Sequence, residues 1–204
     1  TVQTSTCKIG ASCVQTFPRN ATELTALTAP QIASLGGDAR MARWLRGDVA
    51  QESRAGGVFR NRPDGQIMGT IVNSQPIWSK FQDAGYGPGR EPAPGAGTAY
   101  RTYVNSNRTS RPARVFTSSN GGMFHAFDVS GTPATNANYM METYAYVPRA
   151  AYSGLATFAA PGYNHSYLVD GPIVEGDWWN GSQWRTVAIG TTGAGHKGIY
   201  AIDV

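Results

Sequence analysis

Residues 114–129, RVFTSSNGGMFHAFDV, constrain the fold of this chain more than any other stretch. The first half is rich in strand-forming residues, and Asn120-Gly121 is a dipeptide that tolerates the positive φ angles of a type I′ turn. The second half, residues 123–128, places apolar side chains on both faces of the expected strand. We therefore predict a β-hairpin that lies inside a stack of sheets and not at a solvated edge.

A looser copy of this hairpin ends the sequence. Residues 186–204, TVAIGTTGAGHKGIYAIDV, again place a glycine-containing turn between two apolar strands. Related hairpins in series are typical of β-propeller blades. The pattern predicts an all-β fold, a partial β-propeller, with a small helical segment before it.

The composition agrees with a globular, turn-rich β protein. The 204 residues are 41% hydrophobic and 15% charged, and they include 25 glycines and 12 prolines, which argues against wholesale disorder. The net charge of +4 comes from scattered lysines and arginines with no basic block, so no nucleic-acid partner is expected. No apolar run approaches the roughly 20 residues that span a bilayer, so no membrane span is expected.

The two cysteines carry a prediction about compartment. Cys7 and Cys13 are separated by five residues that include a glycine. This spacing predicts a small Cys7–Cys13 disulfide loop in an exported protein. The alternative is two free thiols in a cytosolic chain. Two cysteines alone supply too few ligands for zinc.

Residues 1–60 carry the signals of short helices. Asn20 with Glu23 three residues later resembles a helix-start capping pattern. A further helix is expected over residues 39–46, where apolar side chains at helical spacing form one stripe that includes Trp44. We expect this helical segment to pack on the β domain through Trp44.

The end of that helix spells RGD, which invites an integrin-binding interpretation. Gly47 is well suited to the left-handed position that ends a helix, so Arg46 would lie in the last turn and Asp48 in the exit loop. This structural interpretation is favoured, because an integrin ligand normally presents RGD on an exposed loop tip. Whether the motif also binds a receptor stays open.

The rest of the chain predicts an alternation of strands and loops. A glycine- and proline-rich surface loop is expected over residues 83–98, followed by a short helix or turn over 99–107. A second short helix is expected within 149–159. The further expected strands are residues 67–78, broken by Pro76, 142–148, and a pair formed by 165–171 and 172–179.

The glycines of 193–198 match GxGxxG, but a dinucleotide site needs a helix after them and the sequence predicts a strand. We interpret them as a wide hairpin turn. The three histidines, His125, His165 and His196, lie in separate elements without metal-ligand spacing, and a structural role is favoured for His125. No catalytic residue, cofactor-binding residue or metal ligand is predicted.

Glu175 and Asp177 are paired carboxylates that could in principle serve as an acid/base pair. Their spacing places them on one face of a strand beside Trp178 and Trp179. Glycosidase or sugar chemistry is one interpretation. A solvated strand end is the favoured one.

The order of seven motifs resembles the opening part of the C-terminal domain of PilY-type proteins, which are type IV pilus tip-associated adhesin and biogenesis factors. Together the motifs cover most of residues 40–204. They are WLRGD (44–48), FRNR (59–62), IMGTIVNSQP (67–76), RVFTSSNGGMFHAFD (114–128), YAYVPR (144–149), PGYNHSYLVDG (161–171) and WRTVAIGTTGAGHKGIYAIDV (184–204).

The resemblance implies a modified β-propeller of the quinoprotein-like type and a non-enzymatic role. It implies export through the periplasm, a place at the pilus tip or cell surface, and minor pilins of the tip complex as partners. Pilus assembly and extension, adhesion to host or abiotic surfaces and twitching motility are the implied activities. We expect residues 1–60 to form a disulfide loop and short helices on the propeller, and residues 61–204 to form its first blades.

The sequence departs from the family in one turn and leaves two alternatives. Asn120-Gly121 stands where the family usually has Asn-Asp, and the family's regulatory calcium loop is expected beyond this sequence, so no calcium ligand is assigned. One alternative is a quinoprotein-like dehydrogenase, which the absence of adjacent cysteines disfavours. The other is a carbohydrate-binding surface module.

Overall fold

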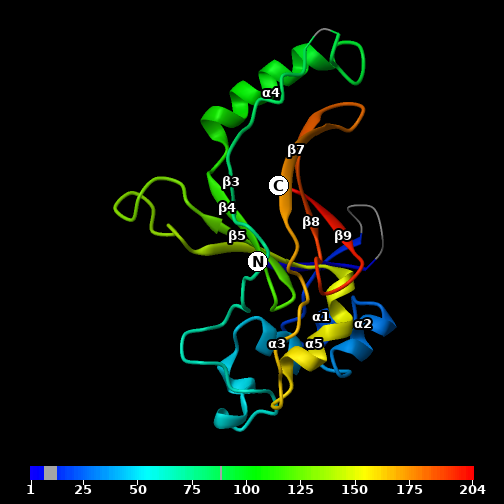
Figure 1. Cartoon of the computed structure of the whole chain (residues 1–204), viewed down its shortest axis with the longest axis vertical. Coiled ribbons are helices and arrows are strands. Elements are labelled where there is room, and N and C mark those ends of the chain that lie inside the picture. The colour runs from blue at the N-terminus through cyan, green and yellow to red at the C-terminus, as the bar shows by residue number, and fades with distance from the viewer. Residues whose placement is uncertain (7–12, 88) are drawn as a thin grey trace.

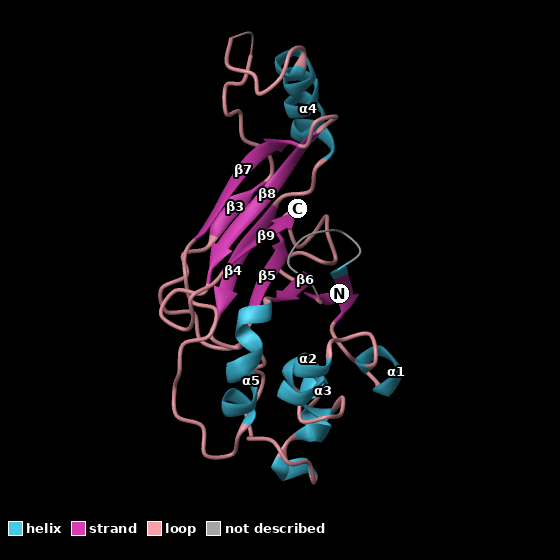
Figure 2. Cartoon of the chain, turned by 90° about the vertical axis from the view of Figure 1, so that its right-hand side faces the viewer, coloured by secondary structure: helices cyan, strands magenta, loops and turns pink. Residues whose placement is uncertain are grey.

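Two stacked β-sheets form the middle of the molecule, with helices at both ends (Figure 1). The computed structural model describes residues 1–6, 13–87 and 89–204. Four helices (α1, α2, α3 and α5) gather at one end of the sheets, while the longest helix, α4, lies over the other end (Figure 2). The sheets therefore connect two separate helical regions.

The first sheet has six strands in the order β2-β1-β6-β5-β4-β3, and the second has three in the order β7-β8-β9. All neighbouring strands are antiparallel except β1 and β6, which are parallel. The strands are β1 (Val2–Ser5), β2 (Val14–Thr16), β3 (Ile77–Ser79), β4 (Arg114–Ser119), β5 (Met123–Asp128), β6 (Glu142–Val147), β7 (Ile173–Trp179), β8 (Trp184–Thr191) and β9 (Ile199–Asp203).

Five α-helices are present among the described residues, and α4 is longer than the sequence indicates. The α-helices are α1 (Ala21–Leu24), α2 (Ala29–Ser34), α3 (Arg40–Leu45), α4 (Ala96–Ser110) and α5 (Tyr152–Ala159), and the 3₁₀ turns are η2 (Val49–Gln51), η3 (Ser53–Ala55) and η4 (Arg149–Ala151). Helices α4 and α5 lie where short helical segments were expected, but α4 has 15 residues, so the fold has more helix than the expected all-β fold with a small helical segment before it.

The predicted central hairpin is confirmed. Strands β4 and β5 pair in register and have strands on both sides in the six-stranded sheet. The turn differs from the prediction, because three residues (120–122) connect the strands and only Gly122 has a positive φ, +87°. A type I′ turn was therefore wrong. The three-residue loop with glycine in the left-handed position is the next commonest hairpin connection.

The two sheets pack face to face through aromatic side chains. Tyr200 of β9 contacts Phe124 of β5 and Tyr146 of β6, with ring centroids 6.1 and 6.0 Å apart. The Tyr200 hydroxyl lies 2.6 Å from Ser118 Oγ, and burial raises the pKa of Tyr200 to about 12. The sheet interface is therefore largely aromatic, and the buried hydroxyls of Tyr200 and Ser118 are hydrogen bonded to each other.

The N-terminal helices form as predicted, and strands accompany them. Asn20 caps α1 by accepting a hydrogen bond from the Glu23 N–H at 2.9 Å. Trp44 of α3 is fully buried, and its ring contacts are with Phe59 and with Phe158 of α5. The sequence predicted no strands in this segment, yet β1 joins β6 in the main sheet.

The RGD motif takes its structural interpretation. Gly47 has φ +106°, and Arg46 is half-buried with its guanidinium donating to the Phe17 carbonyl at 3.1 Å. Asp48 forms an ion pair with Arg43 at 2.7 Å and accepts a hydrogen bond from the Ala50 N–H. All three residues therefore have local structural contacts.

Two predicted strands were wrong. Residues 67–76 contain no strand, since β3 begins only at Ile77, and residues 165–171 contain none either. The backbone N–H groups of Val72 and Asn73 donate to the buried carboxylate of Asp170 instead of to a neighbouring strand. Strand-forming residues need not form a strand where a side-chain carboxylate accepts the backbone hydrogen bonds that a neighbouring strand would otherwise accept.

Candidate functional site: the groove beneath helix α4

Helix α4 forms a second, small core at the far end of the sheets. Gly95, with φ +81°, precedes it, and Ala96, Tyr100 and Val104 form its buried stripe. They pack against Trp184 of β8, whose Nε1–H donates to the Ala96 carbonyl at 2.8 Å. The sequence predicted only a short helix or turn over 99–107; the helix has 15 residues, because the aromatic side chains of the sheet cover its apolar stripe.

The paired carboxylates of β7 lie beneath this helix and are not a solvated strand end. The Tyr100 hydroxyl donates to Asp177 at 2.7 Å, and the Thr186 hydroxyl donates to the same carboxylate at 2.8 Å. The Glu175 side chain is only 1% exposed, and its nearest cation is the Arg111 guanidinium at 3.6 Å. The favoured interpretation was wrong, because Tyr100 of α4 contacts Asp177 and the Glu175 side chain is buried beside Ser79 of β3 and Arg111.

Burial dominates the electrostatics of Glu175. Desolvation raises the pKa of this carboxyl above its ordinary value, and a hydrogen bond with Ser79 and the charge of Arg111 oppose that rise only partly. Asp177 works against them as a like charge. Glu175 and Arg111 lie within ion-pair distance, and Arg111 also donates to Ser79 Oγ at 3.0 Å.

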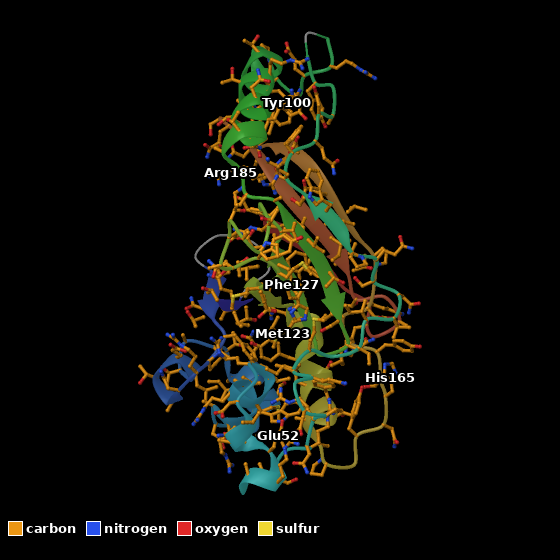
Figure 3. All side chains as sticks on the ribbon, turned by 90° about the vertical axis from the view of Figure 1, so that its left-hand side faces the viewer. Glu52, Tyr100, Met123, Phe127, His165 and Arg185 are labelled. Atoms are coloured by element: carbon orange, nitrogen blue, oxygen red, sulfur yellow. The ribbon has the colours of Figure 1, made fainter. Side chains whose placement is uncertain are left out.

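A groove of about 960 Å³ opens between α4 and the inner faces of the two sheets. Figure 3 labels Tyr100 on α4 and Arg185 on β8, the helix and a strand that contribute lining residues to the groove. Aromatic rings, guanidinium groups and amides dominate its lining. The principal lining side chains are Tyr103, Tyr144, Trp179, Arg111, Arg114, Arg185, Asn107, Gln183 and Asp203.

This lining can bind an uncharged or anionic polar ligand. Aromatic faces and planar hydrogen-bond donors alternate along it, which is typical of pockets that fix a ligand by stacking and by a few placed polar groups. Of the described residues that line it, Asp203 is the only acid, and it is paired with Arg185 at 2.8 Å. The groove is therefore basic.

A second cavity, of about 340 Å³, contains a hydrogen-bonded chain that the sequence did not reveal. Ser119 Oγ lies 2.8 Å from His125 Nε2, and His125 Nδ1 lies 2.5 Å from Glu142 Oε1. The order resembles a serine–histidine–acid triad. Ser119 is fully buried, however, and its Oγ also accepts from the Gly121 N–H at 3.3 Å, so it is not presented as a nucleophile.

This arrangement supports the structural interpretation of His125. Ser119, His125 and Glu142 lie on β4, β5 and β6 respectively, and only the register of those strands brings the three side chains together. No sequence spacing could have shown it. His165 Nε2 lies 3.0 Å from the Thr70 hydroxyl oxygen. His165 therefore has a partner of its own and is not part of the chain that contains His125.

The prediction for the GxGxxG glycines is confirmed, and the prediction for the two cysteines is not tested. The GxGxxG glycines form the turn between β8 and β9, as predicted, and a strand follows them. Cys7 lies outside the described residues, so the Cys7–Cys13 disulfide stays a prediction. Within residues 1–6, 13–87 and 89–204, no group of three or more His, Cys, Asp or Glu side chains is placed to hold a metal ion.

Comparisons with known proteins agree on one family. Residues 68–204 match the family model described as the PilY1 beta-propeller domain. The chain is 36% identical over 189 residues to the type IV pilus biogenesis factor PilY1 homolog of Xylella fastidiosa, covering 91% of this chain and 14% of that protein. It is 36% identical over 177 residues to the type IV pilus biogenesis factor PilY1 of Pseudomonas aeruginosa strain PAK, covering 85% and 14%. No solved structure matches significantly.

The class of protein is therefore a β-propeller domain made of stacked sheets. The chain belongs to the PilY1 β-propeller family. It spans about one seventh of the length of the curated relatives, 14% in each of the two described. None of the described helices is long and apolar enough to cross a membrane.

Proposed function

We propose that this chain is part of a non-enzymatic type IV pilus-associated protein that supports pilus assembly and extension, surface adhesion and twitching motility. The carrying observation is the 36% identity to pilus biogenesis factors over most of the chain. The proposed partners are minor pilins of the tip complex and a host or abiotic surface. The proposed location is extracellular, at the pilus tip or cell surface, after export through the periplasm.

Two observations support a binding role over an enzymatic one. The one triad-like chain, Ser119–His125–Glu142, has a buried serine. The sequence has no adjacent cysteines of the kind found in quinoprotein dehydrogenases. A quinoprotein-like blade type, the Cys7–Cys13 disulfide and a calcium loop elsewhere in the protein remain part of the proposal.

The test is genetic. Deletion of the gene in the source bacterium is expected to reduce surface pili, the twitching zone and attachment, and the intact gene is expected to restore all three. A gene lacking the codons for residues 68–204 is expected to restore none of them, with immunoblots of the exported protein controlling for its presence. Normal piliation, motility and attachment in the deletion strain would refute the proposal.

A further inference from the structure

The connection between β5 and β6 is an uncharged loop that ends in two exposed methionines. Residues 129–141 contain no Asp, Glu, Lys, Arg or His. The loop projects from the side of the six-stranded sheet (Figure 1). Met140 and Met141, immediately before β6, are 61% and 56% exposed. Solvent therefore reaches two neighbouring thioether side chains at this place.

The backbone of this loop is held by hydrogen bonds in which the methionine side chains take no part. The Met140 N–H donates to the Asp128 carbonyl at 2.7 Å, and the Asp128 N–H donates to the Met141 carbonyl at 3.0 Å. Within the loop, the Asn136 side-chain amide donates to the Ser130 carbonyl at 2.9 Å. The two side chains can therefore change chemically while the bonds that hold the loop remain.

The other three methionines of the sequence are less exposed. Met41 of α3 and Met123 of β5 are 7% and 5% exposed and belong to the main core. Met68 is 41% exposed and lines the cavity of about 340 Å³. Exposure therefore ranks Met140 and Met141 first for a reagent that arrives from solvent.

A thioether reacts with hydrogen peroxide by a two-electron oxidation. A sulfur lone pair attacks one peroxide oxygen, and the S–O bond forms as the O–O bond breaks. The departing hydroxide takes the proton of the transferred oxygen, so the products are a sulfoxide and water. The sulfoxide is polar, whereas the thioether is apolar. The reaction therefore changes the polarity of the surface without adding charge.

We propose that Met140-Met141 is an oxidation site, at which peroxide converts both side chains to sulfoxides without unfolding the chain. The reaction switches the end of this loop from apolar to polar. Methionine sulfoxide reductases reduce sulfoxides back to thioethers, so the switch is reversible. The inference follows from exposure, charge and hydrogen bonding, and it does not depend on the pilus role.

The test exposes the 204-residue chain to hydrogen peroxide and follows each methionine by peptide mapping with mass spectrometry. We expect Met140 and Met141 to be oxidised about ten-fold faster than Met41 and Met123, because the last two are buried. Circular dichroism and thermal melting of the oxidised chain are expected to match those of the untreated chain. Its retention on a hydrophobic-interaction column is expected to fall.

A double variant separates these two methionines from the third exposed one. Met140→Leu with Met141→Leu keeps an apolar surface and removes both sulfur atoms, so peroxide is expected to leave its retention nearly unchanged. Leucine is unbranched at Cβ, as methionine is, so it suits the left-handed backbone of Met140 (φ +64°) no worse. Met68→Leu is the matched control and is expected to show most of the fall in retention.

Four results would overturn the inference. The first is oxidation of Met140 and Met141 no faster than that of Met41 and Met123, and the second is unfolding of a chain oxidised at positions 140 and 141 alone. The third is the same fall in retention for the double variant and for Met68→Leu. The fourth is protection of both methionines in the full-length exported protein, where the same mapping is expected to find both sulfoxides. None of these results bears on the deletion test of the pilus role.

Discussion

Asn120 is the residue on which the central hairpin depends most. Its side chain is fully buried, accepts from the Leu168 N–H at 2.9 Å and donates to Asp170 Oδ1 at 3.0 Å. Its backbone N–H donates to the Thr70 carbonyl at 2.8 Å. Through its side chain and its backbone, Asn120 therefore connects the hairpin turn to residues 168–170 and to Thr70, which are far apart in the sequence.

Asn120→Asp is expected to destabilise the fold by about 3 kcal/mol, because it places two buried carboxylates at hydrogen-bond distance. Urea unfolding at pH 7 measures the change. The matched control is Asn180→Asp, since the exposed Asn180 side chain only accepts hydrogen bonds in its turn and a carboxylate can do the same. Equal stability of the two variants would contradict the role of Asn120.

The raised pKa of Glu175 predicts an unusual pH dependence of the free energy of unfolding. Its folded pKa lies above the ordinary value of 4.5, so the folded state holds the proton more tightly than the unfolded state does. The stabilisation is therefore complete below pH 4.5 and is lost as the pH rises through the folded pKa. Glu175→Gln is expected to remove this decline. Unfolding free energies measured between pH 4 and pH 8 check it, and identical slopes for both proteins would contradict it.

At the scale of elements, Gly122 is the residue of the hairpin turn that has a left-handed backbone conformation. Gly122 has φ +87°, and a Cβ there would lie 2.7 Å from Leu155 Cδ2 of α5. Both the backbone conformation and the packing against α5 exclude a side chain.

Gly122→Ala is expected to lower the free energy of unfolding by about 2 kcal/mol, from left-handed strain plus overpacking. Thermal melting measures it. Gly176→Ala on β7 is the control, because a Cβ there meets nothing within 4 Å and its φ is not positive. A Gly122→Ala variant as stable as Gly176→Ala would show that the turn tolerates a side chain.

At the scale of the whole molecule, part of the outer face of the three-stranded sheet is apolar and exposed, beside the Arg185–Asp203 ion pair. Val174 and Ile189 are paired across β7 and β8 and are 60% and 40% exposed, and Ile199 on β9 is 77% exposed. An exposed apolar sheet face of this kind marks an interaction surface. In a propeller of stacked sheets, such a face is suited to pack against another blade.

The double substitution Val174→Thr with Ile189→Thr is expected to change the stability of the 204-residue chain by no more than about 0.5 kcal/mol, because both side chains are exposed. It is also expected to reduce binding of the dye anilinonaphthalene sulfonate and self-association at high concentration. Val49→Thr with Val58→Thr, two exposed valines elsewhere, is the control. An equal reduction in both double variants would refute a specific apolar face.

The sequence alone determined the local elements and the family. The hairpin at 114–129, the Asn20 cap of α1 and the glycine turn before β9 follow from alternation and turn chemistry, which act between neighbours in the chain. The resemblance of ordered motifs to PilY-type proteins was confirmed for the same reason, since it depends only on residue order.

Only the tertiary structure decided which of these residues are buried and what they contact. Glu175 has no sequence signal of burial, and its side chain is buried beside Ser79 of β3 and Arg111, which are distant from it in the sequence. Strand register brings Ser119, His125 and Glu142 together. Asn120 contacts Asp170 because residues 165–171, which the sequence predicted to be a strand, form a loop. The groove is lined by residues from both ends of the chain, Gln3 and Val204 among them, and no local pattern encodes contacts over such separations.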